Sequence, residues 1–208
     1  MQRIYVLITN NLDRFKNKYR IQSARAQWWD YGWNGAYFIT ICTRKKERYF
    51  GDIVDGGMVL SDIGKIAQTE WLKTFEMRPD MNLWMGEYVI MPNHFHAIIG
   101  IGLNAFNTKR KSQNEINCLT ERRDAMHCVS TCNQQPKNKF GSQSKNLASI
   151  VRGFKIGVST YCRKTKSAFA WQPRYHDHII RNEEEFQRIT NYIKTNPENW
   201  KKDKFYCN

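Results

Sequence analysis

Alternating apolar and polar positions predict a series of β-strands along this chain. Each of five segments combines period-two alternation, or a run of β-branched and aromatic residues, with flanking turn residues. We expect strands at residues 37–43, 58–60, 83–91, 94–101 and 175–181. Pro92 and Asn93 separate two of these strands by a tight turn, which predicts an antiparallel pair.

Apolar residues spaced three and four apart predict three amphipathic helices. Their inward positions are Ile63, Ile66 and Ala67 in a helix over 62–75, then Leu147, Ile150, Val151, Phe154, Val158 and Tyr161 in a second helix, and Phe186, Ile189 and Ile193 in a third. Ser61 and Asn182 stand where the first and third helices need N-caps. Pro197 should end the third helix.

This order of elements predicts an α+β fold, in which a ferredoxin-like antiparallel sheet of four or five strands carries helices packed on one face. We expect one domain over residues 35–200, with a basic N-terminal arm at 1–34 and a basic tail at 201–208. Residues 104–146 are polar and poor in apolar positions, so we expect a flexible insertion there. The insertion contains four residues of zinc-binding types, whose spacing fits no common zinc finger: Cys118, His127, Cys128 and Cys132.

The tripeptide His94-Phe95-His96 places two imidazoles on one face of a strand, because side chains at i and i+2 point the same way. The apolar run 97–101 anchors this strand in a core, and Phe95 is expected to turn into the core behind the histidines. Two imidazoles held in this way form half of a site for a divalent ion. The same pattern also fits two core histidines that are only packed and hydrogen-bonded.

Tyr192 and Asn196 lie four residues apart on the third predicted helix, so the phenol and the amide share one face of it. They are candidates for a nucleophile and a third metal ligand. Each also fits an ordinary position, Tyr192 at the margin of the core and Asn196 at a helix end.

The chain has 33 Lys and Arg against 19 Asp and Glu, which gives a formal net charge of +14 and a sequence pI near 9.6. Such a surface attracts polyanions, either nucleic acid or an anionic membrane surface. An apolar run of about 18 residues that could span a membrane is absent, and residues 4–8 are too short for the apolar core of a signal peptide. Six cysteines without a secretory signal favour a reduced cytosol, so we expect a cytoplasmic protein without a disulfide framework.

Several stretches of the chain stand out together. They are GAYFITICT at 35–43, MPNHFH at 91–96, RGFK at 152–155, WQPRYHDHIIR at 171–181 and NYIKTNP at 191–197. With these stretches in this order, the sequence resembles the single-tyrosine HUH transposases, and within them the REP-associated tyrosine transposases and their insertion-sequence relatives. The matching stretches cover most of residues 35–200.

The resemblance implies that His94 and His96 are metal ligands. It assigns Tyr192 as the nucleophile and Asn196 as the third ligand. Insertion-sequence members more often carry glutamine at this last position, so the asparagine points to the REP-associated branch. The resemblance also implies a homodimer that acts on single-stranded DNA with hairpins. Because the chain has no apolar run that could span a membrane, we expect no membrane partner.

Basic residues outside this set are candidates for contact with DNA. They are Arg152, Lys155, Arg163 and Arg174. The first three lie on the polar face of the second predicted helix, where a solvated basic face is the alternative. A second alternating pair, His176 and His178, competes for the metal, and we favour structural or DNA-proximal packing for it.

The chemistry follows from a tyrosine hydroxyl, whose ordinary pKa of about 10 makes it a poor nucleophile until its proton is lost. A divalent ion, Mg²⁺ or Mn²⁺, polarises the scissile phosphate and offsets the charge of the transition state. Together with the resemblance, this chemistry leads us to expect that Tyr192 attacks a phosphodiester in single-stranded DNA, forms a 5′-phosphotyrosine link and releases a 3′-hydroxyl. This reaction would serve transposition or the processing of repeated palindromic elements. The alternative is a non-catalytic protein that binds DNA hairpins and retains the fold.

Overall fold

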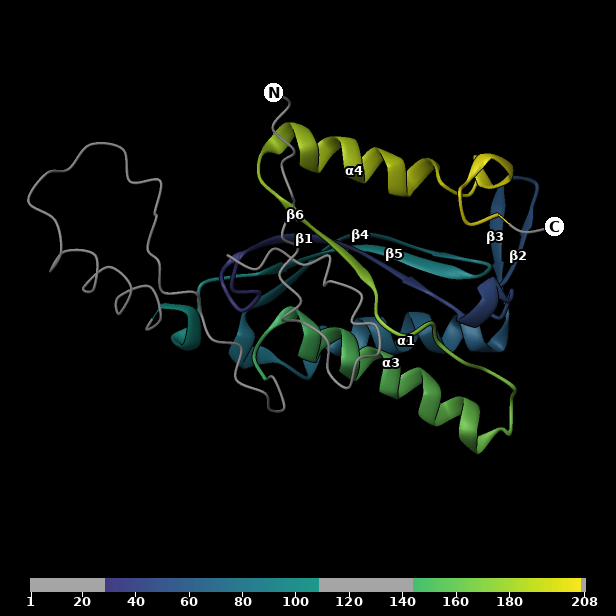
Figure 1. Ribbon diagram of the computed structural model, residues 1–208, viewed down its shortest axis with the longest axis horizontal. Helices are drawn as coiled ribbons and strands as arrows, with labels where there is room; N and C mark the ends of the chain where they lie inside the picture. Colours follow the sequence, from purple (N-terminus) through teal and green to yellow (C-terminus); the bar gives the residue numbers. More distant parts are fainter. Residues whose placement is uncertain (1–28, 109–143, 207–208) are drawn as a thin grey trace, which may run out of the picture.

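The computed structural model describes residues 29–108 and 144–206 (Figure 1). Its strands and long helices are β1 (Gly35–Cys42), β2 (Gly51–Val54), β3 (Gly57–Leu60), α1 (Asp62–Glu76), β4 (Leu83–Met91), β5 (His94–Ile101), α3 (Leu147–Lys164), β6 (His176–Ile180) and α4 (Glu183–Thr195). Short 3-10 helices lie at Arg44–Lys46, Pro79–Met81 and Trp200–Lys202. Most of the expected N-terminal arm and insertion, including the zinc-binding residue types, lies outside the described residues. Within those residues, no helix is both long and apolar enough to cross a bilayer.

Four strands form an antiparallel sheet in the order β4-β5-β1-β6, which confirms the α+β class and the antiparallel sheet. The strand predicted at 58–60 is present as β3, but it does not join this sheet. It pairs with β2 in a separate two-stranded ribbon. The sequence pattern does not predict β2, because Ile53 and Val54 are the only apolar side chains of that strand and Asp52 is charged.

Helices cover both faces of the sheet, so the expectation of helices on one face is wrong (Figure 1). All eight residues of β5 are buried. Phe95 and Ile99 belong to a large core cluster with residues of α1 and α3. Ile98, on the other side of β5, belongs to a second cluster with Ile189 and Ile193 of α4. An uninterrupted apolar run of this kind marks a strand that is covered on both sides.

The face under α1 and α3 holds the larger core. Trp71 of α1 is fully buried, and its ring centroid lies 5.0 Å from that of Phe95 and 5.6 Å from that of Phe154. α1 begins as predicted at the N-cap Ser61, whose hydroxyl accepts a hydrogen bond from the Gly64 N–H at 3.1 Å. This face therefore supplies most of the apolar burial that stabilises the fold.

The opposite face carries α4, and its cap and end match the sequence pattern. The Asn182 side chain accepts a hydrogen bond from the Glu185 N–H at 2.8 Å. The helix ends at Thr195, two residues before Pro197. α4 runs along the sheet (Figure 1), and its last turn brings Tyr192 to His96 of β5.

A contact between β4 and α4 helps to hold the helix in place. Trp84 is the register partner of Gly100 in β5, and a Cβ on Gly100 would collide with the indole ring. The missing side chain leaves room for the indole to lie over β5. The Trp84 ring then lies 6.2 Å, centroid to centroid, from Phe186 of α4.

Candidate active site

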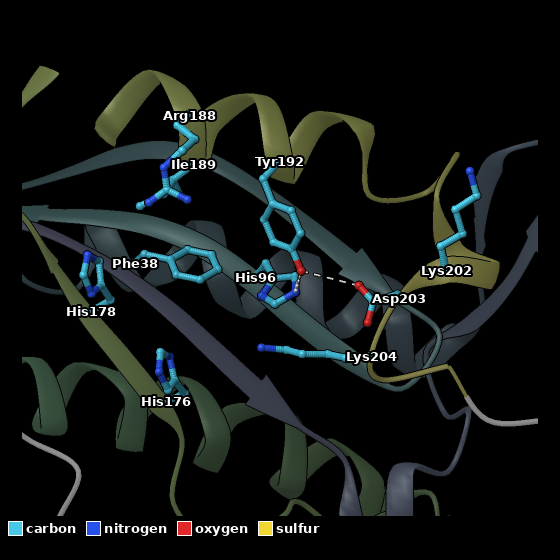
Figure 2. Close-up of a pocket in the computed structure, with 10 residues that line it drawn as sticks. All are labelled: Phe38, His96, His176, His178, Arg188, Ile189, Tyr192, Lys202, Asp203 and Lys204. Carbon is cyan, nitrogen blue, oxygen red and sulfur yellow. Dashed lines mark hydrogen bonds between the residues drawn. The ribbon is translucent and has the colours of Figure 1, made fainter. Parts of the chain in front are cut away.

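Three parts of the chain meet on the sheet face that α4 covers. Figure 2 shows Tyr192 pointing from α4 toward His96 of β5, with Asp203 on the segment that follows α4. His94, His96 and Asn196 are 0%, 1% and 2% exposed, whereas Tyr192 is 38% exposed. The fold thus gathers the predicted nucleophile and the predicted metal ligands in one place.

Hydrogen bonds fix which nitrogen of His94 is free. The Asn93 side-chain N–H₂ donates to two backbone carbonyls, those of Lys46 at 3.2 Å and Phe205 at 2.8 Å. Its Oδ1 therefore faces His94 Nδ1, at 2.9 Å, and accepts the hydrogen of that nitrogen. Nε2 of His94 is left with its lone pair, buried and without a hydrogen-bond partner among the described residues.

His96 is held in a similar way. Its Nδ1 lies 2.9 Å from the Thr40 hydroxyl of the neighbouring strand β1, and its Nε2 lies 3.2 Å from the Tyr192 hydroxyl. With the proton on Nδ1, Nε2 accepts the phenolic hydrogen. A partner on the second ring nitrogen is the arrangement that orients histidine ligands in metal sites.

Burial keeps both imidazoles neutral. Desolvation, with smaller contributions from Lys204 and Lys46, lowers the pKa of His94 to about 3. Burial, and then the neighbouring His94, place the pKa of His96 well below its ordinary value. Neutral imidazole is the form that binds metal ions, so both rings are ready to do so across the physiological range.

Asp203 completes the cluster, although the sequence pattern does not indicate it. One ligand atom each of His94, His96 and Asp203 lie within 4.8 Å of one another. The Asp203 carboxylate accepts hydrogen bonds from the Asn196 side-chain N–H₂ at 3.0 Å and from the Phe205 N–H at 2.6 Å. The predicted basic tail therefore carries an acid into the site.

The donor set fits a divalent ion. It offers two neutral imidazoles, a carboxylate and an amide, a nitrogen and oxygen combination that suits Mn²⁺ or Mg²⁺. His94 Nε2 and Asn196 Oδ1 are both buried without a hydrogen-bond partner in the described part of the chain. An unpaired buried polar atom lowers the stability of the fold by about 1–3 kcal/mol. An ion coordinated by these two atoms would remove that loss.

The Tyr192 hydroxyl lies at the edge of this cluster. The Asp203 carboxylate, 3.4 Å from this hydroxyl, is a second acceptor within reach of its one hydrogen. Burial and then the negative charge of Asp203 raise the pKa of Tyr192 to about 12, against a lowering contribution from Asn196. The phenol is thus protonated at neutral pH and needs a proton acceptor before it can attack.

The basic residues predicted to bind DNA lie away from this site. Arg152, Lys155 and Arg163 are on α3, across the sheet from α4 (Figure 1). The Lys155 ammonium donates to the backbone carbonyls of Gln172 at 2.8 Å and Arg174 at 3.2 Å, and burial lowers its pKa to about 8. The structure does not test a DNA-binding role for these residues or for Arg174, which stays a prediction.

The second histidine pair shares a sheet face with the first but does not join it. Thr40 is the register partner of both His96 and His176, so β1 separates the two pairs. His178 Nε2 lies 2.7 Å from a carboxylate oxygen of Glu185 on α4. Neither His176 nor His178 belongs to a metal-ligand cluster within the described residues.

The sequence does not indicate three residues that reach the site only because distant parts of the chain fold together. Asp203 is a lone acid among lysines, and that isolation is the one signal that could have drawn attention to it. Asn93 fits a turn residue, yet its amide also orients His94 and holds the returning segment at Phe205. Thr40 gives no signal beyond strand alternation.

Comparisons with known proteins agree with this fold. No protein-family model matches the chain. A protein of Haemophilus influenzae (strain ATCC 51907 / DSM 11121 / KW20 / Rd), described as an uncharacterized protein, is 34% identical over 186 residues, which span 89% of this chain and 92% of that protein. A solved structure of a REP-associated tyrosine transposase bound to a REP hairpin aligns with TM-score 0.51 and 17% identity over 84% of this chain and 72% of its own.

A second solved structure, from Deinococcus radiodurans R1, aligns with TM-score 0.33 and 12% identity over 83% of this chain and 96% of its own, which is too distant to support an argument. The alignment with the REP-associated enzyme confirms the expected fold. The chain therefore belongs to one family with the Haemophilus influenzae protein and has the fold of the single-tyrosine transposases.

Proposed function

We propose that this protein is a metal-dependent nuclease and strand transferase that uses Tyr192 to cut and rejoin single-stranded DNA. The observation that carries the proposal is the position of the Tyr192 hydroxyl, 3.2 Å from His96 Nε2 and beside the His94, His96 and Asp203 cluster. A nucleophile next to a group of metal-ligand atoms is the arrangement that phosphoryl transfer requires. A protein that only binds hairpins has no need of it.

His94, His96 and Asn196 are the proposed ligands of a divalent ion. The buried, unpartnered His94 Nε2 and Asn196 Oδ1 support this choice, because an ion would satisfy both atoms. Asp203 already accepts hydrogen bonds from Asn196 and Phe205, and it is the alternative third ligand. The ion would polarise the scissile phosphate and offset the negative charge of its transition state.

In the proposed reaction the Tyr192 oxygen attacks phosphorus and the bond from phosphorus to the 3′-oxygen breaks. The products are a 5′-phosphotyrosine link and a free 3′-hydroxyl. A 3′-hydroxyl from another strand can then attack the link, which restores a phosphodiester and the phenol. The energy of the broken bond is retained in the link, so the cycle needs no nucleotide hydrolysis.

Asp203 is the proposed acceptor of the phenolic proton. The Tyr192 hydroxyl faces two acceptors, His96 Nε2 and the Asp203 carboxylate. Once His96 binds the ion through Nε2, Asp203 is the acceptor that remains. The proton leaves Asp203 for the departing 3′-oxygen, or for water, as the link forms.

The proposed substrate is single-stranded DNA that carries a hairpin. The formal charge of +14 favours a polyanion, and the solved structure with the same fold is of a transposase bound to a REP hairpin. We also propose that the protein acts as a homodimer, in transposition or in the processing of repeated palindromic elements. Light scattering coupled to gel filtration would test the dimer directly.

The test of the function is a cleavage assay. Labelled single-stranded oligonucleotides from the DNA that flanks the gene are incubated with Mn²⁺, with Mg²⁺ or with EDTA, and covalent adducts are resolved on denaturing gels. The proposal predicts an adduct with the wild type and metal, none with EDTA and none with Tyr192→Phe. Tyr161→Phe, on α3 across the sheet, is the matched control and should form the adduct. Binding without an adduct in the wild type would instead identify a hairpin-binding protein.

Asp203→Asn separates the two roles open to that residue. If Asp203 accepts the proton, the variant binds Mn²⁺ with unchanged affinity and loses the adduct. If Asp203 is a ligand, Mn²⁺ affinity falls as well. Asn196→Ala, which removes a proposed ligand, should lose Mn²⁺ affinity and with it the adduct; titration calorimetry measures the affinity.

A further inference from the structure

A pocket of about 430 Å³ opens beside the Tyr192 hydroxyl, between α4 and the strands β5, β1 and β6. It begins at His96 and Asp203 of the metal-ligand cluster and extends toward the edge strand β6. Figure 2 shows Arg188 reaching down from α4, and His176 and His178 standing on β6. The function proposed above makes no use of these three residues.

Strand register explains why the second histidine pair faces this pocket. Thr40 pairs with both His96 and His176, and Phe38 pairs with His178, so these side chains share one face of the sheet. The face that holds the metal-ligand histidines therefore continues across β1 to the β6 histidines. The two pairs are parts of one surface with Tyr192 above it.

The lining of the pocket is suited to an anion. Arg188, Lys202 and Lys204 stand against a single acid, Asp203, among the lining residues. Figure 2 shows the Lys204 ammonium pointing into the space between His176 and His96. Cationic and hydrogen-bonding groups from α4, β6 and the chain after α4 thus meet in one cavity.

Two of these groups keep donors free for a ligand. Arg188 is 70% exposed at its side chain and makes one long contact, 3.6 Å, with Glu185, so most of its five N–H donors are unused. His176 makes no side-chain hydrogen bond within the described residues. His178, in contrast, is held by Glu185 at 2.7 Å and positions the start of α4 over β6.

The floor of the pocket is apolar. Phe38 stacks on His96, with ring centroids 5.2 Å apart, and meets the Tyr192 ring edge-on at 6.2 Å. Ile189 of α4 adjoins it. A cavity with an apolar floor and cationic walls matches a nucleotide, which presents a sugar and a base on one side and a phosphate on the other.

We propose that this pocket is a subsite for the nucleotide next to the scissile bond, in which Arg188 and His176 bind the adjoining phosphate and Phe38 supports the sugar or base. The subsite rests on the proposed function, because the scissile phosphate must lie at Tyr192. Holding the neighbouring phosphate sets the strand in register, so that one phosphodiester meets the nucleophile.

The first test uses variants that remove one cation from α4. Arg188→Ala should raise the KM for adduct formation about tenfold and leave kcat nearly unchanged, because a phosphate contact contributes to binding. His176→Ala should act in the same direction with a smaller change. Lys194→Ala, which removes the same charge from α4 outside the pocket, is the matched control and should alter KM less than twofold.

The second test locates the phosphate. A methylphosphonate, which is uncharged, replaces one phosphate at a time in the cleaved oligonucleotide. In the wild type, the position that adjoins the scissile bond should lose about tenfold in affinity. Arg188→Ala should lose nothing further at that position and should remain sensitive at every other one. Equal sensitivity of the variant and the wild type at all positions would overturn the subsite.

The two tests separate the subsite from the reaction. If the wild type forms no adduct, the proposed function fails, and the methylphosphonate series is then measured as binding to the wild type. A position whose effect disappears in Arg188→Ala would still support the subsite. If Arg188→Ala and His176→Ala form the adduct with the KM of the wild type, the subsite is wrong and the proposed function is unaffected.

Discussion

The two faces of the sheet use the same strands for different purposes. Toward α1 and α3, β5 presents Phe95 and Ile99 to an aromatic core around Trp71. Toward α4, the same strand presents His94 and His96, buried as deeply but surrounded by polar partners. One face therefore stabilises the fold, whereas the other buries polar side chains of a candidate site at a cost in stability.

The difference predicts that mutations on the two faces lower the free energy of unfolding by different amounts. Trp71→Ala should lower the free energy of unfolding by about 3–5 kcal/mol, because it empties a closed aromatic cluster. Trp84→Ala, on the α4 side and 40% exposed, should cost clearly less. Urea unfolding of both variants measures the two values, and equal losses would contradict the division between the faces.

Metal binding on the α4 face should stabilise the folded protein. An ion that binds only the native protein raises the free energy of unfolding by about 2.7 kcal/mol at one hundred times its Kd. Mn²⁺ should therefore raise the melting temperature of the wild type, and His94→Ala should abolish that shift. His178→Ala, whose partner is Glu185, should keep it. A full shift in His94→Ala would remove that residue from the ligand set.

Acid should destabilise the polar face through its histidines. The pKa of His94 is about 3 in the folded protein and near its ordinary value of 6.5 when unfolded. The unfolded chain therefore binds more protons below pH 6.5, and stability falls as the pH drops from there toward 3. The loss is at most about 1.4 kcal/mol per pH unit for each such histidine.

A neutral replacement tests the origin of this slope. His94→Gln cannot take up a proton, so its metal-free stability should depend less steeply on pH between 6 and 4 than that of the wild type. Unfolding in urea across the pH series gives both slopes. Identical slopes would show that other groups cause the acid sensitivity.

The smallest expected effect concerns the phenol itself. Asp203→Asn removes the negative charge beside Tyr192, so the pKa of that tyrosine should fall from about 12 toward its ordinary value. The difference in tyrosinate absorbance between each protein and its Tyr192→Phe counterpart isolates this one group. Glu198→Gln, an exposed residue beyond α4, is the control and should leave the pKa unchanged.

Local features of this chain were predictable and long-range ones were not. The His94 and His96 strand follows from alternation, and the Ser61 and Asn182 caps follow from side chains that bond within three residues. An apolar stripe shows that a helix is buried but not on which side of a sheet. That is why the position of α4 opposite α1 and α3 had to come from the structure.

In the candidate site, too, the local features were predictable and the long-range ones were not. The i, i+2 and i, i+4 spacings bring His94 near His96 and Tyr192 near Asn196, whereas the meeting of the two pairs depends on packing. Asp203 reaches them because the Asn93 amide holds the returning backbone at Phe205. Lys155 fits a solvated helix face in sequence, yet it binds two carbonyls in the fold.

The most direct test of the account is the identity of the residue that becomes linked to DNA. The metal-dependent adduct is digested with trypsin and nuclease and analysed by mass spectrometry. Cleavage after Arg188 and Lys194 releases the peptide ITNYIK, residues 189–194, in which Tyr192 is the single tyrosine. We predict that this peptide carries the nucleotide through a phosphotyrosine bond. A nucleotide on any other peptide, or cleavage without a covalent adduct, would contradict the central claim.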